Sequence, residues 1–213
     1  MITAAKEKLA DIAGPALSLA DPKIDLELAA LAGPLAASLI ELLHIKNGFY
    51  AFESALHVFT TQSSGTEIGL AEWNSPALWI DEYQDMANGC LFFAEDIFGC
   101  QFCIKAASIF QFDPETGRLD KVAGDLESWA AAILRDYPML TGHPLAHEWQ
   151  QANGRIAPGV RLVPKIPFVA GGEFSLQNLY ALDAVKGMRL RGCIARQIRH
   201  LPDGATIRLK VVD

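Results

Sequence analysis

Two histidines near the middle of the chain have a spacing found in metal sites. His143 and His147 are four residues apart, so on a helix both imidazoles would lie on one face. Pro144 suits the first turn of such a helix. The order H-x-x-x-H-E lacks the interposed base of a zinc protease, and the sequence indicates no third ligand. We therefore predict no metal site and no cofactor.

Four cysteines are the second candidates for metal or redox chemistry: Cys90, Cys100, Cys103 and Cys193. Cys100 and Cys103 have C-x-x-C spacing, but residues three apart on a strand point to opposite faces. Zinc would need two more ligands, and no nearby motif is spaced to supply them. Because all four lie on apolar segments, we predict reduced thiols that pack like small hydrophobic side chains.

Acid–base catalysis has weak candidates. His57 is predicted on a strand between apolar residues, with Glu53 nearby as a partner, and a lone histidine in such a place usually serves packing. Glu95 and Asp96 are adjacent, so a strand would point them to opposite faces. Neither a G-x-S-x-G elbow nor a phosphate-binding glycine loop occurs. We predict that the protein is not an enzyme, with a small hydrolase using Glu53 and His57 as an alternative.

The elements that would position these residues are clearest between Gly89 and Leu134. Asp125 is a good N-cap for an amphipathic helix that carries Trp129. Glu95, Asp96 and Gly99 are expected in the loop of the first hairpin. The predicted strands are Cys90–Phe93, Gln101–Ile104, Ile109–Phe112 and Arg118–Val122, followed by the helix Leu126–Arg135.

The two ends of the chain complete the predicted fold. Residues 13–43 read as two short amphipathic helices, because carboxylates and prolines interrupt the apolar run, so we predict no membrane span. The later part predicts an edge strand within Val160–Val169, a strand Asn178–Asp183, an amphipathic helix from Met188 and a strand Thr206–Val212. We predict an α+β fold, with the N-terminal helices packed on a mainly antiparallel sheet and a C-terminal strand-helix-strand extension that continues the sheet or forms a small adjoining layer.

The same residues resemble the SUKH superfamily, a group of bacterial toxin-immunity proteins related to fungal regulators of cell-wall assembly. Leu42–Phe49 is similar to its leucine-rich turn with Asn-Gly, and Phe93–Gly99 through Trp129 is similar to its hairpin and following helix. The paired glycines of the family are replaced by Phe98-Gly99. The resemblance implies a non-enzymatic immunity protein that binds one secreted toxin. It gives a SUKH-like domain over residues 1–150 and a basic extension over 151–213 packed on it.

The charge of the chain is distributed unevenly. Residues 1–150 contain 8 Lys and Arg against 21 Asp and Glu, a balance of −13, whereas residues 151–213 contain 10 against 4, a balance of +6. An acidic body repels nucleic acid and steers basic proteins toward it. The arginines of the C-terminal helix are expected to meet this acidic body, or that of a second copy in a homodimer. With no secretory signal visible, we expect a cytoplasmic protein.

Carboxylates alternate with aromatic residues in one segment of the acidic part. Interfaces favour such aromatics as anchors inside a charged rim. The residues predicted to bind the partner are Glu67, Glu72, Trp73, Trp79, Asp81, Glu82, Tyr83 and Asp85. The alternative is a solvated connection whose aromatics fix it to the core. The partner would be a cognate protein toxin whose active site is occluded; a regulatory or scaffold module that binds a cellular protein is the other non-enzymatic alternative.

Overall fold

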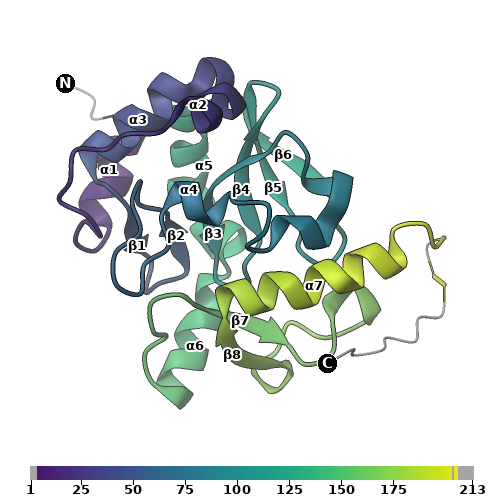
Figure 1. Ribbon diagram of the computed structural model, residues 1–213. Coiled ribbons are helices and arrows are strands. Elements are labelled where there is room, and N and C mark those ends of the chain that lie inside the picture. Colours follow the sequence, from purple (N-terminus) through teal and green to yellow (C-terminus); the bar gives the residue numbers. More distant parts are fainter. Residues whose placement is uncertain (1–3, 203, 206–213) are drawn as a thin grey trace.

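A six-stranded antiparallel sheet lies at the centre of the protein (Figure 1). The structure, a computed structural model, describes residues 4–202 and 204–205. Each strand pairs with the next along the chain, in the order β1-β2-β3-β4-β5-β6, and the one long connection, between β2 and β3, contains α4 (Leu70–Trp73) and η2 (Ile80–Ala87). The strands are β1 (Phe49–Ala51), β2 (Leu56–Val58), β3 (Leu91–Asp96), β4 (Gln101–Lys105), β5 (Ser108–Phe112) and β6 (Leu119–Ala123). The predicted α+β fold is confirmed.

One face of the sheet is covered by four helices: α1 (Ala5–Ile12), α2 (Leu26–Ala32), α3 (Ala36–Ile45) and α5 (Leu126–Thr141). The short 3-10 turn η1 (Gly33–Leu35) joins α2 to α3. Asp125 caps α5 as predicted, accepting a hydrogen bond from the Ser128 amide at 2.7 Å. The Trp129 ring packs edge-on against Phe93 and Phe102. Burial of this aromatic cluster fixes α5 on the sheet.

The opposite face is covered by the short helix α4 (Leu70–Trp73) and the 3-10 segment η2 (Ile80–Ala87). Side chains alternate across a strand, so Phe92 faces this layer while Phe93 faces α5. Trp79 lies with its ring centre 4.9 Å from that of Phe92. This aromatic layer is therefore part of the core.

The C-terminal part forms a second, two-stranded sheet from β7 (Val160–Pro164) and β8 (Leu179–Asp183). The C-terminal extension was predicted either to continue the main sheet or to form a small adjoining layer, and it forms the adjoining layer. Asp183 caps α7 (Ala184–Ile198), so this helix begins before the predicted Met188 and packs across η2 (Figure 1). The remaining elements are α6 (His143–Asn153), η3 (Phe168–Ala170) and η4 (Leu176–Asn178). The predicted boundary between residues 150 and 151 falls inside α6, and the predicted strand Thr206–Val212 lies outside the described residues.

Glu95 and Asp96 differ from their predicted place in a loop. Both belong to β3, and the turn follows them, because β3 continues its pairing with β4 through Glu95 and Gln101. The four cysteines are free, as predicted; Cys90 and Cys103 are buried and the other two are half-buried.

The longest apolar helical run of the described residues is Leu26–Ile45 in the N-terminal part. It spans 20 residues with a mean hydropathy of 1.7 and by length and composition alone could cross a membrane. In the fold η1 divides it into two helices, as predicted, and Leu39, Leu42 and Leu43 on α3 are buried in the core. Core helices meet the same criteria, so the composition alone is weak support for a membrane span.

Candidate functional site

The aromatic anchors predicted for a partner are buried. Trp73, Trp79 and Tyr83 lie in the central core, and their rings contact one another in sequence. The Trp73 indole donates to Gln101 Oε1 at 2.8 Å, and the Tyr83 hydroxyl lies 2.8 Å from the Pro114 carbonyl oxygen. The prediction that these three side chains form a partner surface is therefore wrong. They are the largest apolar groups available to fill the space over this face of the sheet.

Two of the predicted surface carboxylates are paired with arginines at the C-terminal end of α7, one within the helix and one at its C-cap. Glu82 Oε2 lies 2.8 Å from Arg196 Nη2, and Asp85 makes a two-pronged contact with Arg199, with the nearer oxygen at 2.6 Å. The expectation that the arginines meet the acidic body of the same chain is confirmed for these two pairs. The basic C-terminal part thus neutralises some of the acidic segment internally.

The other three predicted carboxylates have different surroundings. Glu67 is half-buried, with Oε2 3.2 Å from the Tyr50 hydroxyl. Glu72 and Asp81 are exposed, and neither forms an ion pair with a described residue. Of the original segment, these two remain free to meet an external cation.

The alternative catalytic pair, Glu53 with His57, does not form. His57 is buried on β2, with Nδ1 3.1 Å from Glu95 Oε1, and burial lowers its pKa. Glu53 lies at the tip of the β1–β2 hairpin and contacts His147 instead. A hydrolase built on Glu53 and His57 is therefore inconsistent with the structure, because His57 is enclosed in a packed layer where no substrate reaches it.

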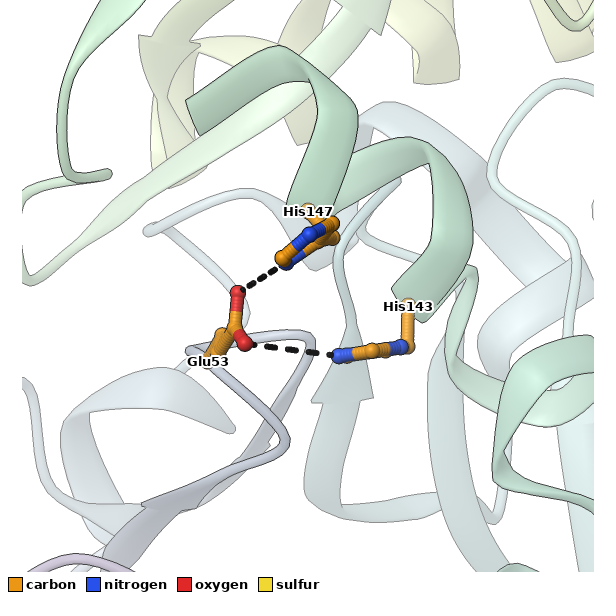
Figure 2. A group of neighbouring side chains, drawn as sticks. All are labelled: Glu53, His143 and His147. Atoms are coloured by element: carbon orange, nitrogen blue, oxygen red, sulfur yellow. Dashed lines mark hydrogen bonds and ion pairs between the residues drawn. The ribbon is translucent and has the colours of Figure 1, made fainter. Parts of the chain in front are cut away.

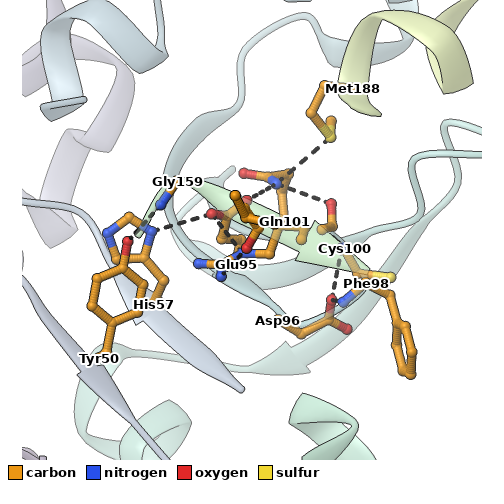
Figure 3. A network of polar contacts seen from close by, with 12 residues as sticks. Tyr50, His57, Glu95, Asp96, Phe98, Cys100, Gln101, Gly159 and Met188 are labelled. Atoms are coloured by element: carbon orange, nitrogen blue, oxygen red, sulfur yellow. Dashed lines mark hydrogen bonds and ion pairs between the residues drawn. The ribbon is translucent and has the colours of Figure 1, made fainter. Parts of the chain in front are cut away.

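Glu95 is the centre of a buried polar network that the sequence did not indicate. Figure 3 shows its carboxylate between His57 and Gln101, whose amide donates to Oε2 at 3.0 Å. Arg161 from β7 brings its Nε to 2.8 Å from Oε1. Burial raises the pKa of Glu95, but Arg161 and His57 more than offset this and lower it to about 2. Spacing gave no signal for this contact, because Arg161 lies 66 positions farther along the chain.

A cavity of about 700 Å³ lies between α7 and the β7–β8 sheet. Its lining includes the cations Lys165, Arg189 and Arg196, together with Glu82 and Glu115. Arg196 is paired with Glu82, and the Arg189 guanidinium donates to the Leu78 carbonyl oxygen, so these two cations already have partners within the protein.

Residues 11–27 expose several apolar and acidic side chains, here called the N-terminal face: Ile12, Leu19, Leu26, Asp11, Asp25 and Glu27. Leu19 is 98% exposed and Leu26 is 88% exposed. Leucine side chains are more often buried, where they stabilise the folded protein. All three carboxylates are exposed. Sequence patterns did not indicate this face, because a leucine in a predicted amphipathic helix is expected in the core.

Comparisons with known proteins give a structural relationship alone. No family model and no curated protein sequence matches the chain. A solved structure, the crystal structure of Atu4351 from Agrobacterium tumefaciens, aligns with a TM-score of 0.54 and 10% sequence identity, covering 88% of this chain and 87% of that one. At this identity the similarity concerns the fold. The resemblance to the SUKH superfamily stays a prediction.

Proposed function

We propose that this protein is a non-enzymatic immunity protein that binds a cognate secreted bacterial toxin and occludes its active site. The observation that supports this best is the N-terminal face, a stretch of chain in which large apolar side chains and carboxylates are both exposed. Protein interfaces place apolar anchors at the centre and polar groups at the rim. Leu19 and Leu26 would be the anchors, and Asp25 and Glu27 would belong to the rim.

The charge of the chain favours a basic partner. Even with Glu82 and Asp85 paired internally, the protein carries a formal net charge of −7. Complementary charge raises the rate of encounter and discriminates against acidic partners. A toxin that acts on an anionic substrate would have a cationic active site, so the carboxylates would take the place of that substrate.

The proposal predicts that a secreted protein with a toxin domain is encoded beside this gene, and the test begins with that protein. Co-expression of the wild-type protein should rescue growth, and the double variant Leu19→Ala/Leu26→Ala should bind the toxin at least about tenfold more weakly, because each side chain would lose its apolar contact. Calorimetry on purified proteins measures this. Met139→Ala is the matched control, since Met139 is 79% exposed but lies outside the N-terminal face.

Equal affinity of the double variant and the wild type would exclude the N-terminal face as the binding surface. Failure of the wild-type protein to bind or rescue would exclude the immunity function itself. The alternative, a regulatory or scaffold module, would then be favoured by stable binding to a cellular protein through the same two leucines.

A further inference from the structure

Three side chains that can bind a metal meet between the β1–β2 hairpin and α6. Figure 2 shows the Glu53 carboxylate directed between the imidazoles of His143 and His147. Glu53 Oε2 lies 2.8 Å from His147 Nδ1, and Oε1 lies 3.9 Å from His143 Nε2. One ligand atom from each residue lies within 4.8 Å of the other two. The third ligand that the sequence did not indicate is thus supplied by a residue 90 positions before His143 in the chain.

The hairpin tip that presents Glu53 has an unusual backbone. Phe52, Glu53 and Ser54 have φ angles of 50°, 54° and 70°, in the left-handed region that non-glycine residues rarely adopt. Such conformations cost free energy and persist where the surroundings enforce them, often at ligand sites. Here the Phe52 ring stacks on Tyr137, and the Gln150 amide donates to the Glu53 carbonyl oxygen at 2.9 Å. The loop is therefore held in place by contacts of the Phe52 side chain and of the Glu53 backbone.

Helix α6 positions the two histidines side by side. Their spacing of four residues places both rings on one face of α6, with ring centres 5.9 Å apart. The Gln151 amide lies 2.8 Å from His147 Nε2, on the side of the ring away from Glu53. A polar group in this position orients a ligating imidazole and fixes which nitrogen faces the metal. Rotation of the amide would let its oxygen accept a hydrogen bond from the Nε2 proton while Nδ1 binds the ion.

The three groups fit a divalent transition-metal ion of intermediate hard–soft character, such as Zn²⁺. Two imidazoles and one carboxylate form the ligand set of several zinc sites, with bonds of about 2.0–2.2 Å. Such bonds require the three ligand atoms to gather around one point, which rotation of exposed or half-buried side chains allows. A cavity of about 560 Å³, lined by Glu53, His147 and Arg155 among others, gives an ion and its water ligands access.

We propose that Glu53, His143 and His147 bind one divalent transition ion, with Zn²⁺ as the representative probe and water completing the coordination. The site is independent of the proposed toxin-binding face, which lies on other residues. The competing interpretation is a plain ion pair between Glu53 and a protonated imidazole. The two interpretations differ in metal stoichiometry and in pH dependence, because a metal requires neutral imidazoles and loses affinity as they become protonated.

The experiment is a Zn²⁺ titration of the full chain, purified without a histidine tag and stripped of metal, by calorimetry in competition with a chelator. We expect one ion per chain, at least about tenfold weaker binding in Glu53→Gln, His143→Ala and His147→Ala, and weaker binding at lower pH. His44→Ala is the matched control. His44 is exposed, with Nδ1 3.8 Å from an Asp21 oxygen, and within the described part of the chain it belongs to no group of three metal-binding side chains.

A second readout identifies the ligands directly. Co²⁺ bound by nitrogen and oxygen gives visible absorption without the thiolate-to-cobalt band that cysteine ligands produce. Unchanged zinc affinity in the three site variants, several weak ions per chain, or a thiolate band that vanishes when Cys90 or Cys103 is replaced would each overturn the proposal. Thermal unfolding of the metal-free variants verifies that they remain folded.

Discussion

Asp96 and Glu95 are neighbours on β3, and their surroundings shift their pKa values in opposite directions. Glu95 faces Arg161 and His57, which lower its pKa to about 2 against the effect of burial. Asp96 points to the other side of the strand, where burial raises its pKa to about 7 although the Phe98 and Cys100 amides donate to it. Alternation along one strand thus separates a carboxylate whose pKa is lowered from one whose pKa is raised.

These shifts predict how stability depends on pH. The folded protein keeps a proton on Asp96 between about pH 4 and pH 7, where the unfolded chain releases it, so this group makes the free energy of unfolding fall as pH rises through that window. Glu95 acts in the opposite sense: its contribution is present above its ordinary pKa of 4.5 and is lost as pH falls toward 2.

The variant Asp96→Asn should remove the first effect, because it keeps an oxygen acceptor but cannot ionise. Urea unfolding at a series of pH values should show a flatter dependence between about pH 4 and pH 7 than in the wild type. Asp120→Asn, an exposed position on β6, is the control and should leave the dependence unchanged. If Asp96→Asn has the same pH dependence as the wild type, Asp96 does not hold its proton in the folded protein.

Between secondary-structure elements, the contact of α7 with η2 depends on a glycine. A Cβ atom at Gly192 would lie 2.7 Å from Glu82 Cβ, closer than packing allows, and 3.0 Å from a Tyr83 ring carbon, which is tighter than most packing contacts. A Cβ atom at Gly187, on the same helix, would meet the ends of two side chains, Val163 at 3.2 Å and Arg191 at 3.4 Å. The two glycines are equivalent in helix propensity and differ in the room around them.

This difference yields a matched pair of variants. Gly192→Ala should lower the free energy of unfolding by about 1–2 kcal/mol, because overpacking outweighs the gain in helix propensity. Gly187→Ala should stay close to the wild type or exceed it. Denaturant unfolding of both variants measures the difference. If the two variants have the same free energy of unfolding, α7 can shift away from η2 at no cost in stability.

Across the molecule, the C-terminal part is joined to the central sheet by a buried charge. Arg161 is fully buried, its Nε is 2.8 Å from Glu95 Oε1, and its guanidinium lies 5.5 Å from the centre of the Tyr50 ring. The adjoining two-stranded sheet therefore supplies the counter-ion of a carboxylate in the main sheet. Removing one member of such a pair leaves an uncompensated charge in the core.

Arg161→Met should therefore destabilise the protein by about 3–5 kcal/mol. The double variant Arg161→Met/Glu95→Gln should recover part of this loss, because no unpaired charge remains buried. A double-mutant cycle with Glu95→Gln, measured by denaturant unfolding, gives the coupling between the two side chains. Strictly additive effects would show that Arg161 contributes packing and no ion pairing.

Features that depend on neighbouring residues could be read from the amino-acid order alone. The strands around Cys90–Ile104 and Ile109–Val122, the Asp125 cap and the amphipathic α7 follow from local periodicity and turn chemistry, and the structure contains each of them. The order of the sheet follows the chain, since each strand pairs with its successor.

Contacts between distant parts of the chain required the folded protein. The spacing of His143 and His147 was visible in the sequence, but their third neighbour, Glu53, arrives through the packing of the hairpin on α6. Likewise, the pattern of Trp73, Trp79 and Tyr83 was equally compatible with a surface and with a core. Their burial follows from the free energy gained when the aromatic rings fill the space over the sheet, and that space exists only once the chain has folded.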